Sequence, residues 1–166
     1  QQEFTYKNQS ADTLSVLYFN DWSNAYAHKD SPLASRFADD FKKNLHLASK
    51  ELRGGTDLIG AVDQNYYSLP WWRTKEKDII GISLNKPIAP GDFEIITFTY
   101  TVKLPPNKYT SYGYDTEGGY FLKDWYLTPA VYNHKEWLLY SNKDLQDLYT
   151  DITNTVIKIN YAKELV

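Results

Sequence analysis

The sequence contains no cysteine and no methionine, and only three of its 166 residues are histidine. The absence of cysteine excludes disulfide bonds, thiolate nucleophiles and cysteine-ligated zinc sites. It does not indicate a cellular compartment. The absence of methionine, together with the opening residue Gln1, predicts that the chain does not start at a native translation start. We expect either a removed leader or, as the favoured interpretation, a fragment of a longer multidomain protein.

Long hydrophobic runs and clustered positive charge are also missing. No apolar run approaches the roughly 20 residues that cross a bilayer, so no membrane span is expected. The net charge is -3, and the Lys and Arg residues are dispersed. Without a basic stripe, a nucleic-acid partner is not expected. The length predicts one domain, residues 1–166, with a continuous core.

The common catalytic motifs do not occur. There is no His-Glu-x-x-His zinc motif, no Gly-x-Ser-x-Gly elbow and no phosphate-cradling glycine loop. Metal-ligand spacing is absent around the three histidines, which are His28, His46 and His134. Three carboxylates gather near a Tyr-rich loop and could serve a calcium site or a glycosidase pair, although a solvated acidic loop is favoured; they are Asp115, Glu117 and Asp124. We therefore predict no catalytic residue, no metal ligand and no cofactor in this chain.

Aromatic residues make up 16% of the chain, including 15 Tyr and 5 Trp, and they favour strands. Turn residues separate short segments of strand character, which are 3–7, 13–19, 58–62, 66–71, 78–84, 93–104, part of 120–132, 137–140 and 149–161. Residues 8–12 form a polar turn, and 144–147 an acidic one. The longest run, 93–104, carries bulk on both faces, which predicts a central strand.

One segment has helical periodicity. Ser31 and Pro32 are a favourable N-cap and first-turn pair. Apolar residues then recur every four positions, at Leu33, Phe37, Phe41 and Leu45. This spacing predicts an amphipathic helix over 32–49. The fold class expected is mainly β, an antiparallel, saddle-like β-sandwich with one inserted helix.

Several aromatic side chains are candidates for surface recognition. Trp71 and Trp72 are adjacent in a predicted strand, so they point to opposite faces, and we expect one in the core and one exposed. The full set of possible interface or ligand-stacking residues is Trp71, Trp72, Tyr112, Tyr114, Trp125 and Tyr126.

Several segments carry a family resemblance. The first, at 6–14, contains Tyr6, Asn8, Ser10, Asp12, Thr13 and Leu14. The others are Asn24-Ala25-Tyr26, Pro32-Leu33-Ala34 with Phe37, the strand and Pro-Gly turn of 79–92, Trp125-Tyr126-Leu127-Thr128-Pro129, and the alternating segment 149–157. Together they resemble the N-terminal β-domain of bacterial zinc aminopeptidases of the aminopeptidase N type (gluzincins), over nearly the whole chain.

The resemblance implies a division of labour. Such a domain precedes a thermolysin-like catalytic domain that holds the zinc and the His-Glu-x-x-His motif, so zinc belongs to the parent and not to this chain. The expected partner is that catalytic domain, with peptide substrate bound indirectly, in an extracytoplasmic (periplasmic or cell-envelope) location. In many relatives this domain lends a glutamine to the substrate amine, but the matching region 125–132 has none. The resemblance therefore implies a non-catalytic domain that helps to wall the substrate cleft.

Two interpretations from other classes stay open. A carbohydrate-binding module would use Trp71 or Trp72 and the loop 109–120 as a stacking platform. A structural, adhesin-like module would have neither activity nor a coplanar aromatic platform.

Overall fold

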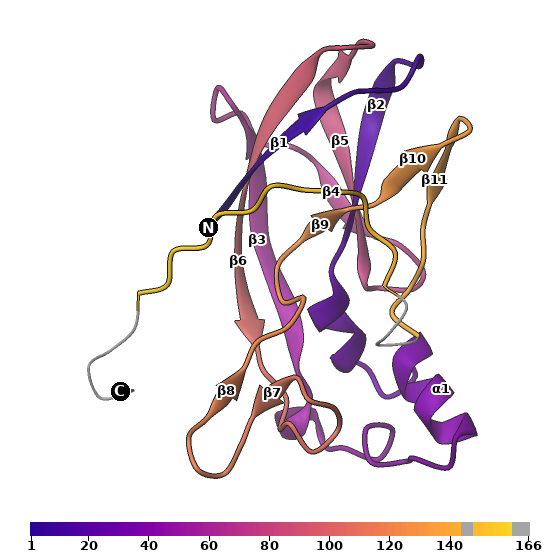
Figure 1. Cartoon of the computed structure of the whole chain (residues 1–166), viewed down its shortest axis with the longest axis vertical. Coiled ribbons are helices and arrows are strands. Elements are labelled where there is room, and N and C mark those ends of the chain that lie inside the picture. The colour runs from indigo at the N-terminus through magenta and orange to yellow at the C-terminus, as the bar shows by residue number, and fades with distance from the viewer. Residues whose placement is uncertain (144–147, 161–166) are drawn as a thin grey trace.

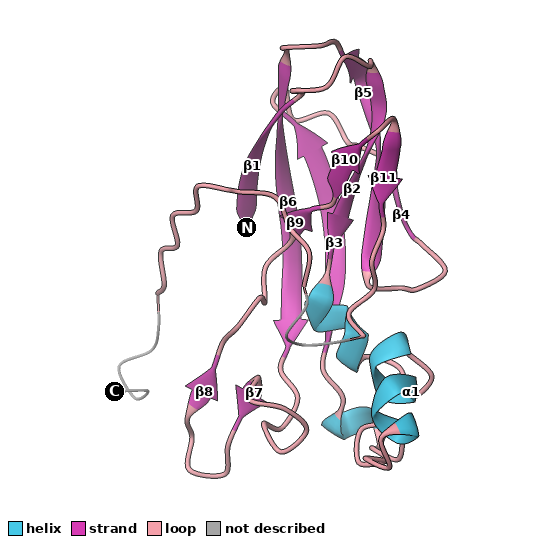
Figure 2. Ribbon diagram, turned by 45° about the vertical axis from the view of Figure 1, so that its right-hand side comes forward, coloured by secondary structure: helices cyan, strands magenta, loops and turns pink. Residues whose placement is uncertain are grey.

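The computed structural model describes residues 1–143 and 148–160 and is mainly β (Figure 1). Two antiparallel sheets face each other, as the sandwich prediction requires (Figure 2). The first sheet has the order β1 (Gln2–Lys7), β6 (Phe93–Lys103), β3 (Gly55–Asp63). The second has the order β4 (Trp71–Arg73), β5 (Ile79–Ile88), β2 (Leu14–Asn20), β9 (Thr128–Pro129). Two hairpins complete the strands, β7 (Gly113–Tyr114) with β8 (Tyr120–Phe121) and β10 (Val131–Asn133) with β11 (Glu136–Leu138).

An apolar core fills the space between the sheets. Alternation along β6 turns Ile96 and Phe98 inward, where both are fully buried. Phe98 meets Phe19 of β2 edge-to-face, with ring centroids 4.8 Å apart. β6 pairs with β1 on one side and β3 on the other, which confirms the prediction of a central strand.

The first two strands do not pair with each other, because β1 belongs to one sheet and β2 to the other. The polar turn between them is fixed by Asn8, which is fully buried. Its Nδ2 donates to the carbonyls of Asp12 at 2.7 Å and Ile88 at 3.1 Å, and its Oδ1 accepts from the Ser10 amide at 3.0 Å. The turn is therefore a strap that ties the two sheets together at one end.

The predicted helix is present but shorter, since α1 covers Pro32–Asp39. Its start is as expected, with the Ala34 amide donating to Ser31 Oγ. Phe41 then takes a left-handed φ of 61°. The amides of Phe41 and Lys42 donate to the carbonyls of Ala38 (3.0 Å) and Phe37 (2.7 Å), the pattern of a Schellman C-cap. The extension to residue 49 was wrong because this cap turns Phe41 outward, leaving it 91% exposed.

A second, smaller core lies under α1 and a 3₁₀ turn, η1 (Trp22–Tyr26). It is formed by Ala25, Tyr26, Leu33, Ala34, Leu45 and Tyr112. Leu45 is thus buried as predicted, although it reaches the core from a turn that follows the helix. A further 3₁₀ turn, η2 (Lys50–Leu52), leads into β3. Within the described residues, no helix is long and apolar enough to cross a membrane.

Two strand predictions were wrong. Residues 149–160 form no strand and are exposed, with Ile152 at 97%. Their apolar side chains alternate to both faces, so a strand there would need cover on both sides. Residues 66–70 form no strand, because a turn at 64–65, with Tyr66 at φ 64°, brings them back against β3 through an isolated bridge between Ser68 and Val62, and the strand begins at Trp71. The acidic turn 144–147 and Tyr161 lie outside the described residues.

Candidate functional site

The two tryptophans of β4 are both partly exposed, Trp71 at 37% and Trp72 at 39%, so the expectation that one is buried was wrong. Trp72 lies over Gly81, where a Cβ atom would come within 2.3 Å of its indole ring. The missing side chain at Gly81 therefore makes the slot that holds Trp72. The Tyr18 ring meets this indole edge-to-face at 6.1 Å.

The other predicted recognition residues lie elsewhere. Tyr112 is buried in the second core, and Trp125 packs against it. Tyr114 is half-buried on β7, at the opposite end of the molecule from the sandwich (Figure 1). The rings of Trp125 and Tyr126 meet at 86°. The structure therefore separates the six candidates into two groups, and their ring pairs are edge-to-face or, for Tyr112 with Tyr26, tilted at 39°, rather than in one plane.

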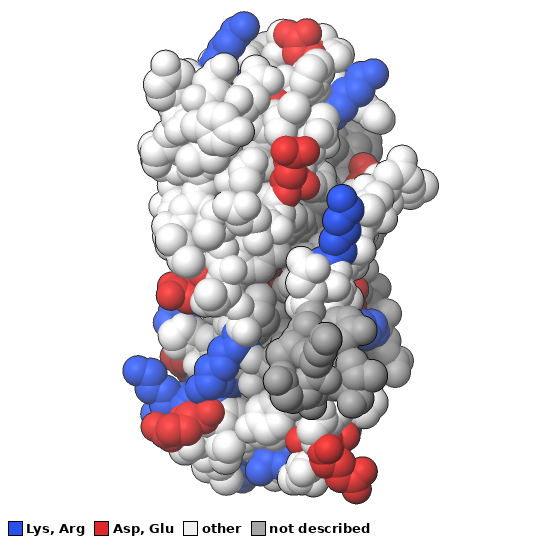
Figure 3. All heavy atoms as spheres, turned by 90° about the vertical axis from the view of Figure 1, so that its left-hand side faces the viewer, with Lys and Arg blue, Asp and Glu red and all other residues white. Residues whose placement is uncertain are grey.

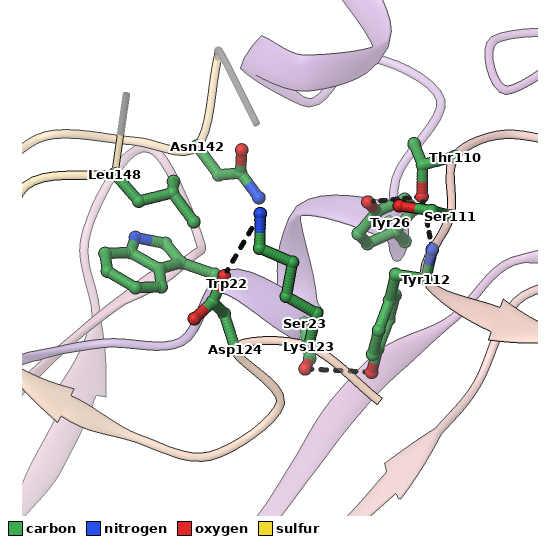
Figure 4. A pocket seen from close by; sticks show the side chains of 10 residues that line it. All are labelled: Trp22, Ser23, Tyr26, Thr110, Ser111, Tyr112, Lys123, Asp124, Asn142 and Leu148. Atoms are coloured by element: carbon green, nitrogen blue, oxygen red, sulfur yellow. Dashed lines mark hydrogen bonds and ion pairs between the residues drawn. The ribbon is translucent and has the colours of Figure 1, made fainter. Parts of the chain in front are cut away.

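A small polar cavity of about 40 Å³ opens between η1 and the loops around residues 110 and 123 (Figure 4). Its lining is Trp22, Ser23, Tyr26, Thr110, Ser111, Tyr112, Lys123, Asp124, Asn142 and Leu148. Trp22 Nε1 and Asn142 Oδ1 are buried there without a hydrogen-bond partner in the described part of the chain. At about 10–15 Å³ of such volume per water, the cavity accommodates roughly three waters or one small polar group.

The hydroxyl groups of this cavity are linked in pairs. Ser23 Oγ lies 3.0 Å from Tyr112 OH, and Tyr26 OH lies 3.0 Å from Thr110 Oγ1. Burial raises the pKa of Tyr26 and of Tyr112 to about 12. Tyr112 therefore keeps its proton near neutral pH and is no base for Ser23. The cavity can bind a polar group, but this pair does not form a nucleophile.

Between the two cores lies a buried polar belt made of Asp21, Asn24, Thr56, Arg73 and Asp78. Thr56 Oγ1 donates to Asp21 Oδ1 at 2.6 Å, and Arg73 Nη1 forms an ion pair with Asp21 Oδ2 at 2.8 Å. Asn24 connects β3 of the first sheet to the turn before β5 of the second, since it accepts from the Thr56 amide and donates to the Lys77 carbonyl. The belt joins the ends of β2, β3, β4 and β5 where the sandwich meets the helical end.

Burial dominates the electrostatics of the belt. It raises the pKa of Asp21, against the opposing effects of Arg73 and Thr56. It also raises the pKa of Asp78 to about 6, although Ser141 Oγ at 2.7 Å and the Asn142 amide at 2.8 Å donate to Asp78 Oδ2. The other oxygen, Oδ1, is buried with no hydrogen-bond partner in the described residues. Asp78 thus holds the segment after β11 in place through Ser141 and Asn142. At neutral pH its carboxylate is ionised although it is buried away from solvent.

The predicted acidic loop has a structural use. Asp115 Oδ1 accepts from the amides of Glu117 at 2.9 Å and Gly119 at 2.6 Å, and so closes the turn between β7 and β8.

His46 Nδ1 lies 2.8 Å from the Lys29 carbonyl. Across residues 1–143 and 148–160, no three His, Asp or Glu side chains are placed to hold a metal ion together.

The outer face of the first sheet carries an apolar and threonine-rich surface on β6 and β3, bordered by the exposed, charged Glu3 and Lys7 of β1. Alternation places Phe93, Ile95, Thr97 and Thr99 of β6 on this face, with Thr5 of β1 in register with Ile95. Phe93 is 57% exposed, and Ile59, at the bulge in β3, is 65% exposed. Figure 3 looks onto this side and shows an area without charged side chains on the left of its upper half, with charged side chains at the top and to the right of it. Contiguous apolar and β-branched surface of this kind is typical of an interaction site.

The sequence predictions missed the polar belt. Asp21 and Asp78 each stand next to a strand, where an acidic residue usually caps a turn in solvent. The flanking sequence could have indicated that both carboxylates are buried, because Trp22 directly follows Asp21 and Ile79 directly follows Asp78.

Comparison with protein-family models, with curated proteins and with solved structures finds no match to this chain.

Proposed function

We propose that this chain is a non-catalytic N-terminal domain of an extracytoplasmic zinc metallopeptidase of the aminopeptidase type. In this proposal it packs on the catalytic domain, which holds the zinc, and helps to wall the substrate cleft. Most of the segments that resemble such domains lie on the turn between β1 and β2, on η1, α1 and β5, and at β9, whereas the last, 149–157, forms no strand. They support a role in architecture and docking rather than in chemistry.

The observation that carries the proposal is the apolar and threonine-rich surface of β6 and β3 on the outer face of the first sheet, beside the charged Glu3 and Lys7 of β1. It exposes Phe93 and Ile59 beside a row of threonines on a regular sheet. Burying such a surface against a partner domain is favourable by about 25 cal/mol per Å² of apolar area. A rigid β-sheet also presents this area without a loss of loop entropy on docking.

The test is association with the domain encoded after Val166. The downstream reading frame is first searched for His-Glu-x-x-His, and the encoded domain is then titrated with this chain by calorimetry. Phe93→Asp should weaken binding about tenfold or more, because it places a charge in the contact. The matched variant Thr116→Asp, in the exposed β7–β8 turn, should bind like the parent chain.

Enzyme assays test the non-catalytic part separately. The 166-residue chain should bind no stoichiometric zinc and should not hydrolyse aminoacyl-arylamides. Turnover by the zinc-loaded, purified chain would contradict the proposal.

A carbohydrate-binding module is the second candidate, favoured by the part-exposed indole of Trp72 over Gly81. Calorimetry against a glycan panel distinguishes the two functions. Saturable glycan binding that is lost in Trp72→Ala would support the module.

A further inference from the structure

A groove of about 320 Å³ lies at the lower end of the β3–β6 pair. Its walls come from the segment after η1, from η2 with the residues that follow it, and from the facing ends of β3 and β6. Four basic side chains line it, His28, Lys50, Arg53 and Lys103, whereas Asp57 is the one carboxylate in the lining.

The fold brings these cations together from distant parts of the sequence. Strand register sets Lys103 opposite Gly55, and Lys103 Nζ donates to the Lys50 carbonyl at 3.2 Å. One Nη of Arg53 donates to the Ala48 carbonyl, which holds the guanidinium at the groove. These hydrogen bonds fix the ammonium group of Lys103 and the guanidinium of Arg53, whereas Lys50 contributes its carbonyl to the contact with Lys103.

These charges are not neutralised within the described chain. The ion pairs there are Arg36 with Asp40, Arg73 with Asp21 and Lys123 with Asp124, so Lys50, Arg53 and Lys103 have no carboxylate oxygen within 4.0 Å. Such a concentration of cations is notable in a chain of net charge -3.

The groove cations also act on two neighbouring titratable groups, as a smaller effect beside burial or hydrogen bonding. Burial lowers the pKa of His28, and Lys77, Arg53 and Arg73 lower it further, against the opposite effect of Asp30. On the rim, the pKa of the exposed Glu51 is lowered mainly by a hydrogen bond from Ser49, with a contribution from Lys103 and Lys50.

We propose that this groove binds the phosphate group of a small phosphorylated ligand. The other Nη of Arg53, with the ammonium groups of Lys50 and Lys103, matches the charge and the acceptor oxygens of a phosphate dianion. The groove is larger than a phosphate group, which leaves room for the organic part of a phosphate monoester. Asp57 and the dispersed charge elsewhere disfavour an extended polyanion.

The experiment is a titration of the ¹⁵N-labelled, 166-residue chain at constant ionic strength, with calorimetry in parallel. One arm uses inorganic phosphate and the other glucose 6-phosphate, which distinguishes free phosphate from an organic phosphate. Saturable shifts are expected at the amides of Gly54, Gly55 and Thr56. Lys103→Gln and Lys50→Gln should each weaken binding about tenfold, the loss of one charge-assisted hydrogen bond.

Lys86→Gln is the matched control, because it removes one exposed positive charge from β5, outside the groove. It should bind phosphate like the parent chain. Thermal unfolding of each variant shows whether it is folded, and two independent lysine variants protect the test from one folding failure. The proposal is overturned if neither phosphate source binds saturably, or if Lys86→Gln weakens binding as much as the groove variants do.

Discussion

Phe19 and Phe98 meet at the centre of the sandwich among purely apolar neighbours, whereas Asp21 and Asp78 are equally buried a short distance beyond the strand ends. The sandwich depends on removing apolar area from water, a non-directional effect that tolerates small changes in geometry. The polar belt depends on matched donors and acceptors, and an unmatched one is costly there. The molecule thus has an apolar interior in the sandwich and a polar interior in the belt. The cavity beside η1 and the basic groove both border the polar belt.

The largest expected effect is in the sandwich. Phe98→Ala should lower the free energy of unfolding by about 3–5 kcal/mol, because it removes a fully buried ring and leaves a cavity. Phe41→Ala is the control, since Phe41 is almost fully exposed and should change stability by less than about 0.5 kcal/mol. Urea denaturation measures both. Equal effects would show that the core does not depend on this ring pair.

In the polar belt, Arg73→Leu should cost about 2–3 kcal/mol. The change leaves the buried Asp21 carboxylate without its cation and frees the Thr56 carbonyl. The expected loss is less than for a fully buried pair because the Arg73 side chain is 21% exposed. Adding Asp21→Asn should recover part of it, and a double-mutant cycle in urea measures the coupling. Additive effects would mean that the two side chains act independently.

The smallest expected effect is a gain, in Asp78→Asn. The folded chain raises the pKa of Asp78 from 3.8 to about 6, so between these values the native state binds more protons than the unfolded state. Stability from this group therefore falls as pH rises through that window, the reverse of a salt-bridged aspartate. Asn keeps an oxygen to accept from Ser141 and Asn142, and it should raise stability at pH 7 by about 1–2 kcal/mol.

Unfolding measured from pH 4 to 7 checks this sign. The variant should show a shallower decline with pH than the parent chain, the remaining slope coming in part from Asp21, whose pKa is also raised. Asp92→Asn, in an exposed turn, should leave the slope unchanged. If Asp78→Asn also leaves it unchanged, Asp78 ionises normally in the folded chain.

The elements that sequence predicted well are those set by local periodicity. Bulky residues on both faces of the segment 93–104 marked β6 as a central strand, and Ser31-Pro32 marked the start of α1. The helix end was missed because Phe41 adopts a left-handed conformation that glycine usually supplies. Residues 149–160 have strand composition, but pairing needs an edge as well as composition.

The candidate sites were largely hidden from the sequence. The basic groove joins Lys50 and Arg53 to Lys103, and only the register of β3 with β6 brings them together. The polar belt likewise gathers residues from four strand ends. Trp72 was found by its type, but its partner Gly81 gave no signal, since a glycine in a strand also marks bulges and close backbone approaches.

The strap at Asn8 has a consequence for how the chain comes to be folded. β1 is made first on the ribosome, yet its partner β6 is made only after β2 to β5, since Phe4 stands opposite Ile96. Until then β1 has no strand to pair with, and the first sheet cannot close. Closing so long a loop is slow. The strap closes only when Ile88 to Asp92 are made, so β1 stays an unpaired edge, open to pairing with other nascent chains, until β6 emerges.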